Sequence, residues 1–556
     1  MAATIADAER VLLTRFGYPG FRPAQRRVVE SVLAGRDTLA VLPTGGGKSI
    51  CFQVPALLRE GLTLVLSPLV SLMTDQVDAL RRRGISAAGL HGGLTASEQA
   101  DAVARAVAGE VSLVYVAPER LTTGRALAAL SRARVGLLAV DEAHCISEWG
   151  HEFRPAYRGI AAIRTAIGGP QCVALTATAT AAVRTDIVRV CGLRAPQVLV
   201  GGFDRPNLRF EVRRVPSRRR RDAALIEALR SVNGAAVAYA LSRARVERVA
   251  TALRREGVAA AAYHAGQWSD QSRATQDAFM AGDLRVIVAT SAFGMGVDKA
   301  DVRAVVHDAI PPSLEAYYQE AGRAGRDRRR ATCVLLYAPT DRRIPEHFAR
   351  AAVPDRGVIE RVWAAIQAAA WPALEPVAVA AACGVPPAEG RGAFAVLERA
   401  GLMRLEHGDR DTLRVRLLAT PERFTALHGA RTVERALIED LRAAGAAYTR
   451  TADVALERVQ PGLRVGIDAT LQRLAAASIL VWSRPGAGWR LVEGTRRAAA
   501  PVDWASLDAQ RTAVRARLAA VIGYAEARRC RRAVLLDYFG ERLAPGSCTG
   551  CDRCDG

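Results

Sequence analysis

The strongest constraint on the fold is a pattern that repeats through residues 38–340. A short apolar segment is followed by a loop and then by an amphipathic helix. Strands that alternate with helices form parallel sheets with helices on both faces. The segment 201–216 separates two groups of apolar strands. The predicted strands are 38–42, 62–66, 111–116, 135–140, 172–175, 235–240, 258–263, 286–289, 304–307 and 333–337. The chain is therefore expected to be an α/β protein with two sheet-based lobes.

The charge balance indicates a polyanionic partner. Lys and Arg number 77 against 56 Asp and Glu, a formal net charge of +21. Nucleic acid is the first expectation and an anionic membrane surface the second. The N-terminus has no secretory signal pattern, and no apolar run is long enough to span a bilayer. We expect a cytoplasmic protein, associated with the nucleoid in a bacterium.

Beyond residue 341 the pattern changes. Residues 342–428 and 429–500 each read as short helices followed by a β-hairpin, the first within 403–418 and the second within 479–492. Helices followed by a hairpin are typical of a winged helix, so we predict two winged-helix-like domains. A helical stretch and a cysteine cluster then fill 501–556. The predicted lobes before them are 1–203 and 204–341.

A glycine-rich loop follows the first predicted strand and opens a helix. It contains Thr44, Gly45, Gly46, Gly47, Lys48 and Ser49. Glycines let backbone N–H groups face phosphate oxygens, and a helix N-terminus adds positive potential. Lys48 would reach the β- and γ-phosphates of ATP, and Ser49 would hold Mg²⁺. Because Leu42 stands where the strict motif has Gly, a simple glycine-rich turn is the alternative.

Two further segments suit phosphoryl transfer. Asp141 and Glu142 end an apolar strand, where ligands bind in open α/β sheets. Asp141 would hold Mg²⁺, and Glu142 would orient and deprotonate the attacking water. Gln319, Arg323 and Arg326 lie late in the second lobe, where the arginines could reach developing phosphate charge. The alternatives are a solvated acidic strand end and a basic surface helix.

Together these motifs resemble the RecQ family of superfamily-two DNA helicases, and the likeness covers most of residues 13–340. The family implies two RecA-like lobes. Residues 16–25 resemble its adenine-recognition segment. By that resemblance Gln25 reads the adenine edge, while Tyr18 and Arg22 pack on the base.

The resemblance also implies contacts with DNA. Segments 67–76, 117–120 and 294–299 look like the family's strand-contacting and coupling motifs. Residues 145–155 resemble an aromatic-rich loop that senses single-stranded DNA; Trp149 and Phe153 can stack on bases, and Arg154 can reach phosphate. Without the resemblance, these aromatics could equally be core. The DNA-binding or coupling residues predicted are His144, Trp149, His151, Phe153, Arg154, Thr176, Thr178, Ser242 and Arg243.

Four cysteines cluster near the end of the sequence. Cys530, Cys548, Cys551 and Cys554 suit tetrahedral Zn²⁺, and their context resembles the RecQ zinc module. Four unrelated thiols are the alternative. Neighbouring Arg528, Arg529, Arg531 and Arg532 could hold DNA phosphates or form a solvated basic face. In the family this module usually follows lobe two directly, whereas here residues 342–529 intervene, which puts the usual geometry in question.

The resemblance implies an enzyme that uses ATP, Mg²⁺ and Zn²⁺ to move 3′→5′ on single-stranded DNA and to unwind duplex DNA in recombination and repair. Single-strand-binding or repair proteins are expected partners, and a membrane is not. The alternatives are an RNA-duplex motor and a nucleotide-gated DNA-binding or strand-annealing protein. Trp482 and Trp489 flank the turn at 485–488. They could separate strands at a hairpin tip or form a cross-strand pair that stabilises the hairpin.

Overall fold

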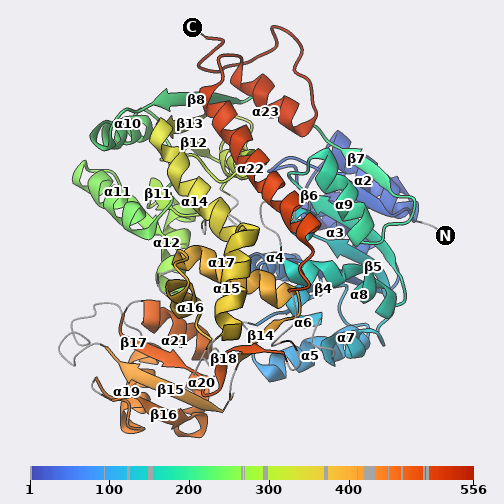
Figure 1. Ribbon diagram of the computed structural model, residues 1–556. Coiled ribbons are helices and arrows are strands. Elements are labelled where there is room, and N and C mark those ends of the chain that lie inside the picture. Colours follow the sequence, from blue (N-terminus) through green and yellow to red (C-terminus); the bar gives the residue numbers. More distant parts are fainter. Residues whose placement is uncertain are drawn as a thin grey trace. The chain divides into compact units, whose positions relative to one another are not determined.

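The computed structural model shows two compact units (Figure 1). The first comprises residues 1–265, 272–341 and 517–556, and the second comprises 266–271 and 342–516. No helix among the described residues is both long and apolar enough to cross a bilayer. The described residues are 3–92, 94–121, 125–147, 154–264, 267, 269–291, 293, 299–368, 374–407, 409, 411–418, 432–448, 450–464, 467–476, 478–492, 495 and 500–555.

Lobe one is built on a seven-stranded parallel sheet in the order β3-β4-β2-β5-β6-β1-β7. Its strands are β1 (Thr38–Val41), β2 (Leu62–Leu66), β3 (Ala87–Leu90), β4 (Leu113–Val116), β5 (Val135–Val140), β6 (Gln171–Thr176) and β7 (Gln197–Val200). Along β1, Leu39 and Val41 join one apolar core while Ala40 joins another. Both faces of the sheet are therefore covered, as the sequence predicted. Strands β3 and β7 were not predicted.

Helices and short helical turns connect these strands. They are α1 (Ile5–Val11), η1 (Leu12–Phe16), α2 (Pro23–Leu33), α3 (Ile50–Ala56), α4 (Val70–Arg82), α5 (Ala96–Val107), α6 (Pro118–Leu121), α7 (Arg125–Leu130), η2 (Ala143–Ile146), η3 (Pro155–Gly159), α8 (Ile160–Ala166) and α9 (Ala181–Val190). Thr180 caps α9 by accepting a hydrogen bond from the N–H of Val183. This cap satisfies one of the free N–H groups at the start of a helix.

Lobe two has a six-stranded parallel sheet in the order β10-β11-β9-β12-β13-β8. Its elements are β8 (Leu208–Arg214), α10 (Arg218–Arg230), β9 (Ala235–Tyr239), α11 (Arg243–Arg255), β10 (Ala260–Tyr263), α12 (Ser269–Ala281), β11 (Val286–Ala289), β12 (Val302–His307), α13 (Leu314–Ala321), β13 (Ala331–Tyr337) and η4 (Pro339–Arg342). Alternate residues of β13 again face different cores, Leu335 one and Leu336 the other. The two predicted parallel-sheet lobes are confirmed.

The C-terminal zinc module packs on lobe two. It contains the end of α22 (Trp504–Glu526), α23 (Arg531–Phe539) and the cysteine loop. Val521, Tyr524 and Cys551 belong to the same apolar core as the lobe-two sheet. Cys551 also forms a parallel bridge with Phe210 of β8. The module therefore contacts lobe two directly, although residues 342–516 intervene in the sequence.

The second unit holds two small cores, each with helices and a sheet. Its elements are α14 (Arg343–Ala352), α15 (Arg356–Ala368), α16 (Pro376–Ala382), α17 (Pro387–Arg399), β14 (Met403–His407), β15 (Thr412–Leu417), α19 (Thr432–Ala443), β16 (Ala452–Ala455), η5 (Leu456–Arg458), α20 (Pro461–Arg464), α21 (Ile467–Ala476), β17 (Leu480–Ser483) and β18 (Ala487–Leu491). Phe394 and Leu397 of α17 belong to the first core, and Leu437 and Leu471 belong to the second.

Both predicted hairpins are wrong, because their second strands are exchanged. Strand β14 pairs with β18 and not with β15. Strand β15 pairs with β16 and β17, giving the sheet order β16-β15-β17 (Figure 1). The elements between β14 and β18 thus form the second core, and β18 belongs again to the first core, beside β14. The two cores do not follow the predicted division at residue 428.

The two tryptophans consequently lie in different sheets. Trp482 pairs opposite Val415 and packs on the second core. Trp489 pairs opposite Leu405 and meets Phe394 edge-on, with ring centroids 5.5 Å apart. They do not form a cross-strand pair, so that interpretation is wrong, whereas the predicted contact with DNA stays a prediction.

Candidate nucleotide site and zinc centre

The glycine-rich loop joins β1 to α3 in a conformation that depends on its glycines. Gly45 and Gly47 have φ of +75° and +71°, which side chains disfavour. A Cβ on Gly46 would lie 2.7 Å from the carbonyl oxygen of Pro43, and a Cβ on Gly47 would lie 2.3 Å from Nε2 of Gln25. Ser49 takes the N-cap position of α3. The loop is therefore a cradle whose backbone packs so closely against its neighbours that only glycine fits at these positions.

The N-terminal segment lies directly against this cradle. Gln25 donates from Nε2 to the carbonyl oxygens of Gly46 and Gly47, at 3.0 and 3.1 Å. Arg22 donates to the carbonyl oxygen of Gly45, and its own N–H donates to Oε1 of Gln25 at 2.9 Å. Tyr18 is 49% exposed. Of the predicted adenine-recognition residues, Gln25 and Arg22 thus adjoin the phosphate loop.

The acidic pair stands at the carboxyl end of β5, as the sequence predicted. Lys48 Nζ lies 3.0 Å from Oε1 of Glu142. His144 Nδ1 lies 3.3 Å from Oε2 of Glu142 and 3.0 Å from Oγ1 of Thr176. Glu142 has φ +45°, a left-handed conformation that costs a non-glycine residue on the order of 1 kcal/mol. This backbone conformation places the carboxylate between Lys48 and His144.

The two carboxylates differ in their protonation tendency. Burial raises the pKa of Asp141, and the negative charge of Glu142 raises it further. Burial acts in the same direction on Glu142, but Lys48 and His144 outweigh it and lower the pKa of Glu142. Glu142 therefore remains a carboxylate, the form that a general base requires. Asp141 is the group that gains most from a nearby cation.

The arginine segment of lobe two lies against the phosphate loop of lobe one. Arg323 is 7% exposed and Gln319 is 8% exposed, close to the end of α13. A Cβ on Gly45 would lie 3.3 Å from Cγ of Arg326, and a Cβ on Gly322 would lie 3.0 Å from Cβ of Thr44. The structure thus brings together the three segments that the sequence assigned to phosphoryl transfer.

The predicted DNA-contacting residues are only partly described. Arg154 donates to the carbonyl oxygen of Pro68 at 2.7 Å and lies 3.8 Å from Glu119, so it connects two predicted strand-contacting motifs. Thr176 accepts a hydrogen bond from the N–H of Thr178. Ser242 caps α11, and Arg243 beside it is exposed. Trp149, His151, Phe153 and residues 294–298 lie outside the described residues.

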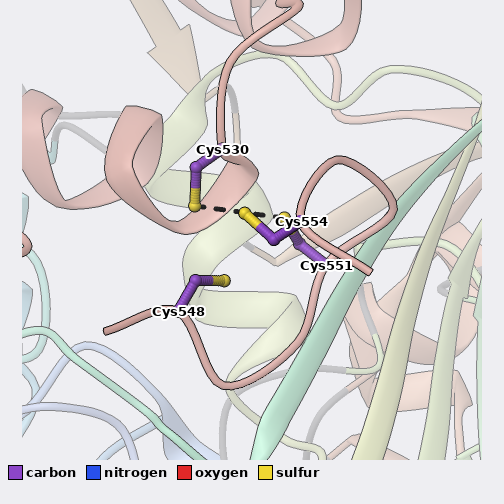
Figure 2. Close-up of side chains that lie close together, drawn as sticks. All are labelled: Cys530, Cys548, Cys551 and Cys554. Atoms are coloured by element: carbon purple, nitrogen blue, oxygen red, sulfur yellow. Dashed lines mark hydrogen bonds between the residues drawn. The ribbon is translucent and has the colours of Figure 1, made fainter. Parts of the chain in front are cut away.

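The four C-terminal cysteines converge on one point (Figure 2). Their sulfur atoms all lie within 4.8 Å of one another, and Cys530 and Cys551 are 3.9 Å apart. Tetrahedral zinc with sulfur at about 2.3 Å requires comparable spacing. Hydrogen bonds from the N–H groups of Arg531 and Arg553 overcome burial and lower the pKa of Cys551 to about 7. These thiols fit a structural zinc ion that has no open coordination position.

Two of the neighbouring arginines have a structural role. Arg531 and Arg532 are each 1% exposed. Arg531 pairs with Asp552 at 2.9 Å, and Arg532 pairs with Asp204 at 2.6 Å. Both interpretations from the sequence, a phosphate contact and a solvated face, are therefore wrong for these two side chains. Arg531 instead stabilises the zinc module internally, and Arg532 binds the module to the linker between the lobes.

Three sequence-family models match the chain. DEAD/DEAH box helicase covers residues 22–186, helicase conserved C-terminal domain covers 220–328, and RecQ zinc-binding covers 495–555. The last model coincides with the four converging cysteines. In its helicase segments and in its zinc-binding region the chain is therefore similar to RecQ proteins.

Curated relatives show the same similarity. The chain is 45% identical over 331 residues to the ATP-dependent DNA helicase RecQ of Pasteurella multocida, covering 60% of this chain and 52% of that protein. It is 43% identical over 336 residues to the RecQ protein of Bacillus subtilis, covering 60% and 56%. The chain thus spans about half the length of the RecQ relatives it matches. The solved structure of the DUF1998 helicase MrfA bound to DNA has the same fold in part, with a TM-score of 0.52 at 20% identity over 61% of this chain and 52% of that one.

Proposed function

We propose that this protein is an ATP-dependent DNA helicase that translocates 3′→5′ on single-stranded DNA, unwinds duplex DNA and acts in recombination and repair. The observation that carries the proposal is the ion pair between Lys48 of the phosphate loop and Glu142 at the end of β5. The Arg323–Arg326 segment of lobe two packs against the same loop. A site shared by two lobes can change shape with the state of the nucleotide, which is what a motor requires.

Each residue of the nucleotide site has a distinct task in ATP hydrolysis. The cradle of Gly45–Gly47 presents backbone N–H groups to phosphate, and Lys48 supplies a positive charge. Glu142 holds the attacking water and accepts its proton. Arg323 and Arg326 stabilise negative charge that develops on the phosphoryl group. The buried Asp141, next to Lys48 and Glu142, is the carboxylate suited to a cation.

Magnesium fits this arrangement. Ser49 at the N-cap of α3 and Asp141 at the end of β5 would hold it, and the ion supplies neutralising charge to the phosphates when bound. The four cysteines would hold zinc for stability. The partners are single-stranded and duplex DNA, in keeping with the formal charge of +21. Single-strand-binding or repair proteins are further proposed partners.

A single-turnover strand-displacement assay tests the proposal. Duplex DNA with a 3′ tail should be unwound when ATP and Mg²⁺ are present, whereas a 5′-tailed duplex should not be. Lys48→Ala should abolish displacement, because it removes the cation that pairs with Glu142. Preferential unwinding of tailed RNA would support the RNA-motor alternative. Faster annealing without any displacement would support the strand-annealing alternative.

A further inference from the structure

Arg205 lies in the linker between the lobes and forms an unusual set of hydrogen bonds. Its guanidinium donates to four backbone carbonyl oxygens: Thr44 at 3.1 Å, Gly322 at 3.2 Å, and Ala324 and Gly325 both at 2.9 Å. Its Nε–H donates to Oδ1 of Asn207 at 3.4 Å. Among the described residues no carboxylate forms an ion pair with it. Neutral carbonyl groups therefore hold this cation.

These carbonyl groups come from both lobes. Thr44 belongs to the phosphate loop of lobe one, and Gly322, Ala324 and Gly325 belong to the arginine segment of lobe two. The same two segments are already in contact, because a Cβ on Gly322 would lie 3.0 Å from Thr44. A planar guanidinium presents its N–H donors in a fixed fork. Arg205 can thus set the position of one segment relative to the other.

The backbone on either side of Arg205 is itself fixed. Phe203 stacks on Phe539 of α23 with ring centroids 4.6 Å apart, and its carbonyl oxygen accepts a hydrogen bond from Tyr318 at 2.6 Å. Asp204 pairs with the fully buried Arg532 at 2.6 Å. Two elements, α13 and the zinc module, therefore hold the linker. Movement of the guanidinium would require these contacts to break.

We infer that Arg205 is a positioning residue for ATP hydrolysis, which fastens the Gly322–Gly325 segment to the phosphate loop and so sets where Arg323 and Arg326 meet the nucleotide. The inference rests on the proposed function. Arg205 acts through its neighbours and does not touch the reacting atoms. A displacement of about 1 Å in a catalytic group costs on the order of 100-fold in rate. The linker that carries Arg205 thereby connects the zinc module to the nucleotide site.

The test compares Arg205→Ala and Arg205→Lys with the wild-type chain. Arg205→Ala should lower the kcat of single-strand-stimulated ATP hydrolysis by about 100-fold, while its Kd for a fluorescent ATP analogue stays within about two-fold. Arg205→Lys keeps the positive charge but loses the forked set of N–H donors. Its kcat should therefore lie between those of the wild-type chain and Arg205→Ala. Arg285 provides the matched control, since among the described residues it donates only to two carbonyl groups of lobe two, those of Val232 and Leu229. Arg285→Ala should leave kcat within about two-fold.

Hydrogen exchange provides a readout that does not depend on hydrolysis. In Arg205→Ala, amides of both 44–48 and 322–326 should exchange about ten-fold faster, equivalent to about 1.4 kcal/mol. In Arg285→Ala neither segment should change. Unaltered exchange in both segments, or wild-type kcat in Arg205→Ala, would overturn the inference. A wild-type chain that hydrolyses no ATP would refute the proposed function instead, and the exchange rates would still decide whether Arg205 fastens the segments.

Discussion

Replacing Glu142 by Gln tests the chemistry of the nucleotide site with little change in the shape of the side chain. The amide oxygen can still accept from Lys48, which lies 3.0 Å from the carboxylate. What disappears is the negative charge that would take a proton from water. A general base contributes about 10²–10⁴-fold to a rate. We therefore expect kcat to fall about 1,000-fold, which is about 4 kcal/mol of lost transition-state stabilisation.

The assay measures phosphate release with saturating single-stranded DNA, together with the Kd for nucleotide. The Kd should stay close to wild type, because Lys48 and the glycine loop are intact. Glu434→Gln is the matched control: Glu434 is 1% exposed and pairs with Arg473 at 3.1 Å in the second unit. It should leave kcat within about two-fold. A Glu142→Gln protein that keeps more than about a tenth of the wild-type kcat would refute the role of Glu142 as the base.

Three other outcomes are expected. Trp149→Ala should retain basal ATP hydrolysis but lose its stimulation by single strands, because base stacking contributes about 1–3 kcal/mol per base; normal stimulation would make the side chain mere core. Elemental analysis should find one zinc per chain, and Cys551→Ser should lower the thermal midpoint, since zinc binding and folding are linked; a purified chain without zinc would contradict this. Trp489→Ala should cost about 2 kcal/mol of stability, because the half-buried ring packs on Phe394, with unwinding per folded molecule unchanged. Slower unwinding at unchanged stability would instead favour a contact with DNA.

The lobes could be predicted because their strands are continuous apolar runs between helices. The strands that were missed show the limit of that signal. Strand β3 reads Ala-Ala-Gly-Leu, with too little apolar bulk to stand out. Strand β8 alternates Leu208, Phe210 and Val212 with charged residues, because it is the edge of its sheet and is only half buried. A half-buried edge strand looks like a linker when only continuous apolar runs are sought.

Much of the candidate site could also be predicted, because side chains with distinctive chemistry occur there at fixed spacing. Lys48, Asp141 and Glu142 carry that signal in the sequence. Arg205 does not, since its partners are backbone carbonyl groups of Thr44 and of the Gly322–Gly325 segment. Because every residue has a backbone carbonyl group, no residue type in the sequence marks the partners of Arg205. Only the fold reveals that these distant segments meet at one side chain.

The strand pairing in the second unit was mispredicted for a similar reason, because the sequence pattern fits more than one partner strand. In β15, Leu413, Val415 and Leu417 are buried and the residues between them are more exposed. Such alternation specifies which face of a strand is buried but not which neighbour it pairs with. Pairing β15 with β14 would satisfy that pattern as well as pairing it with β17. The sequence therefore predicted the strands and placed them in the wrong sheets.

Packing also explains why the zinc module lies on lobe two despite its late position in the sequence. Arg532 is buried and needs both Asp204 and the carbonyl oxygen of Leu208, 2.6 Å from its guanidinium. Removing the Asp204 carboxylate would leave the buried charge without its ion-pair partner, at a cost of several kcal/mol. Tyr524 and Cys551 complete the apolar core beneath β8. Since these contacts are fixed by side chains and not by chain order, residues 342–516 can intervene without displacing the module.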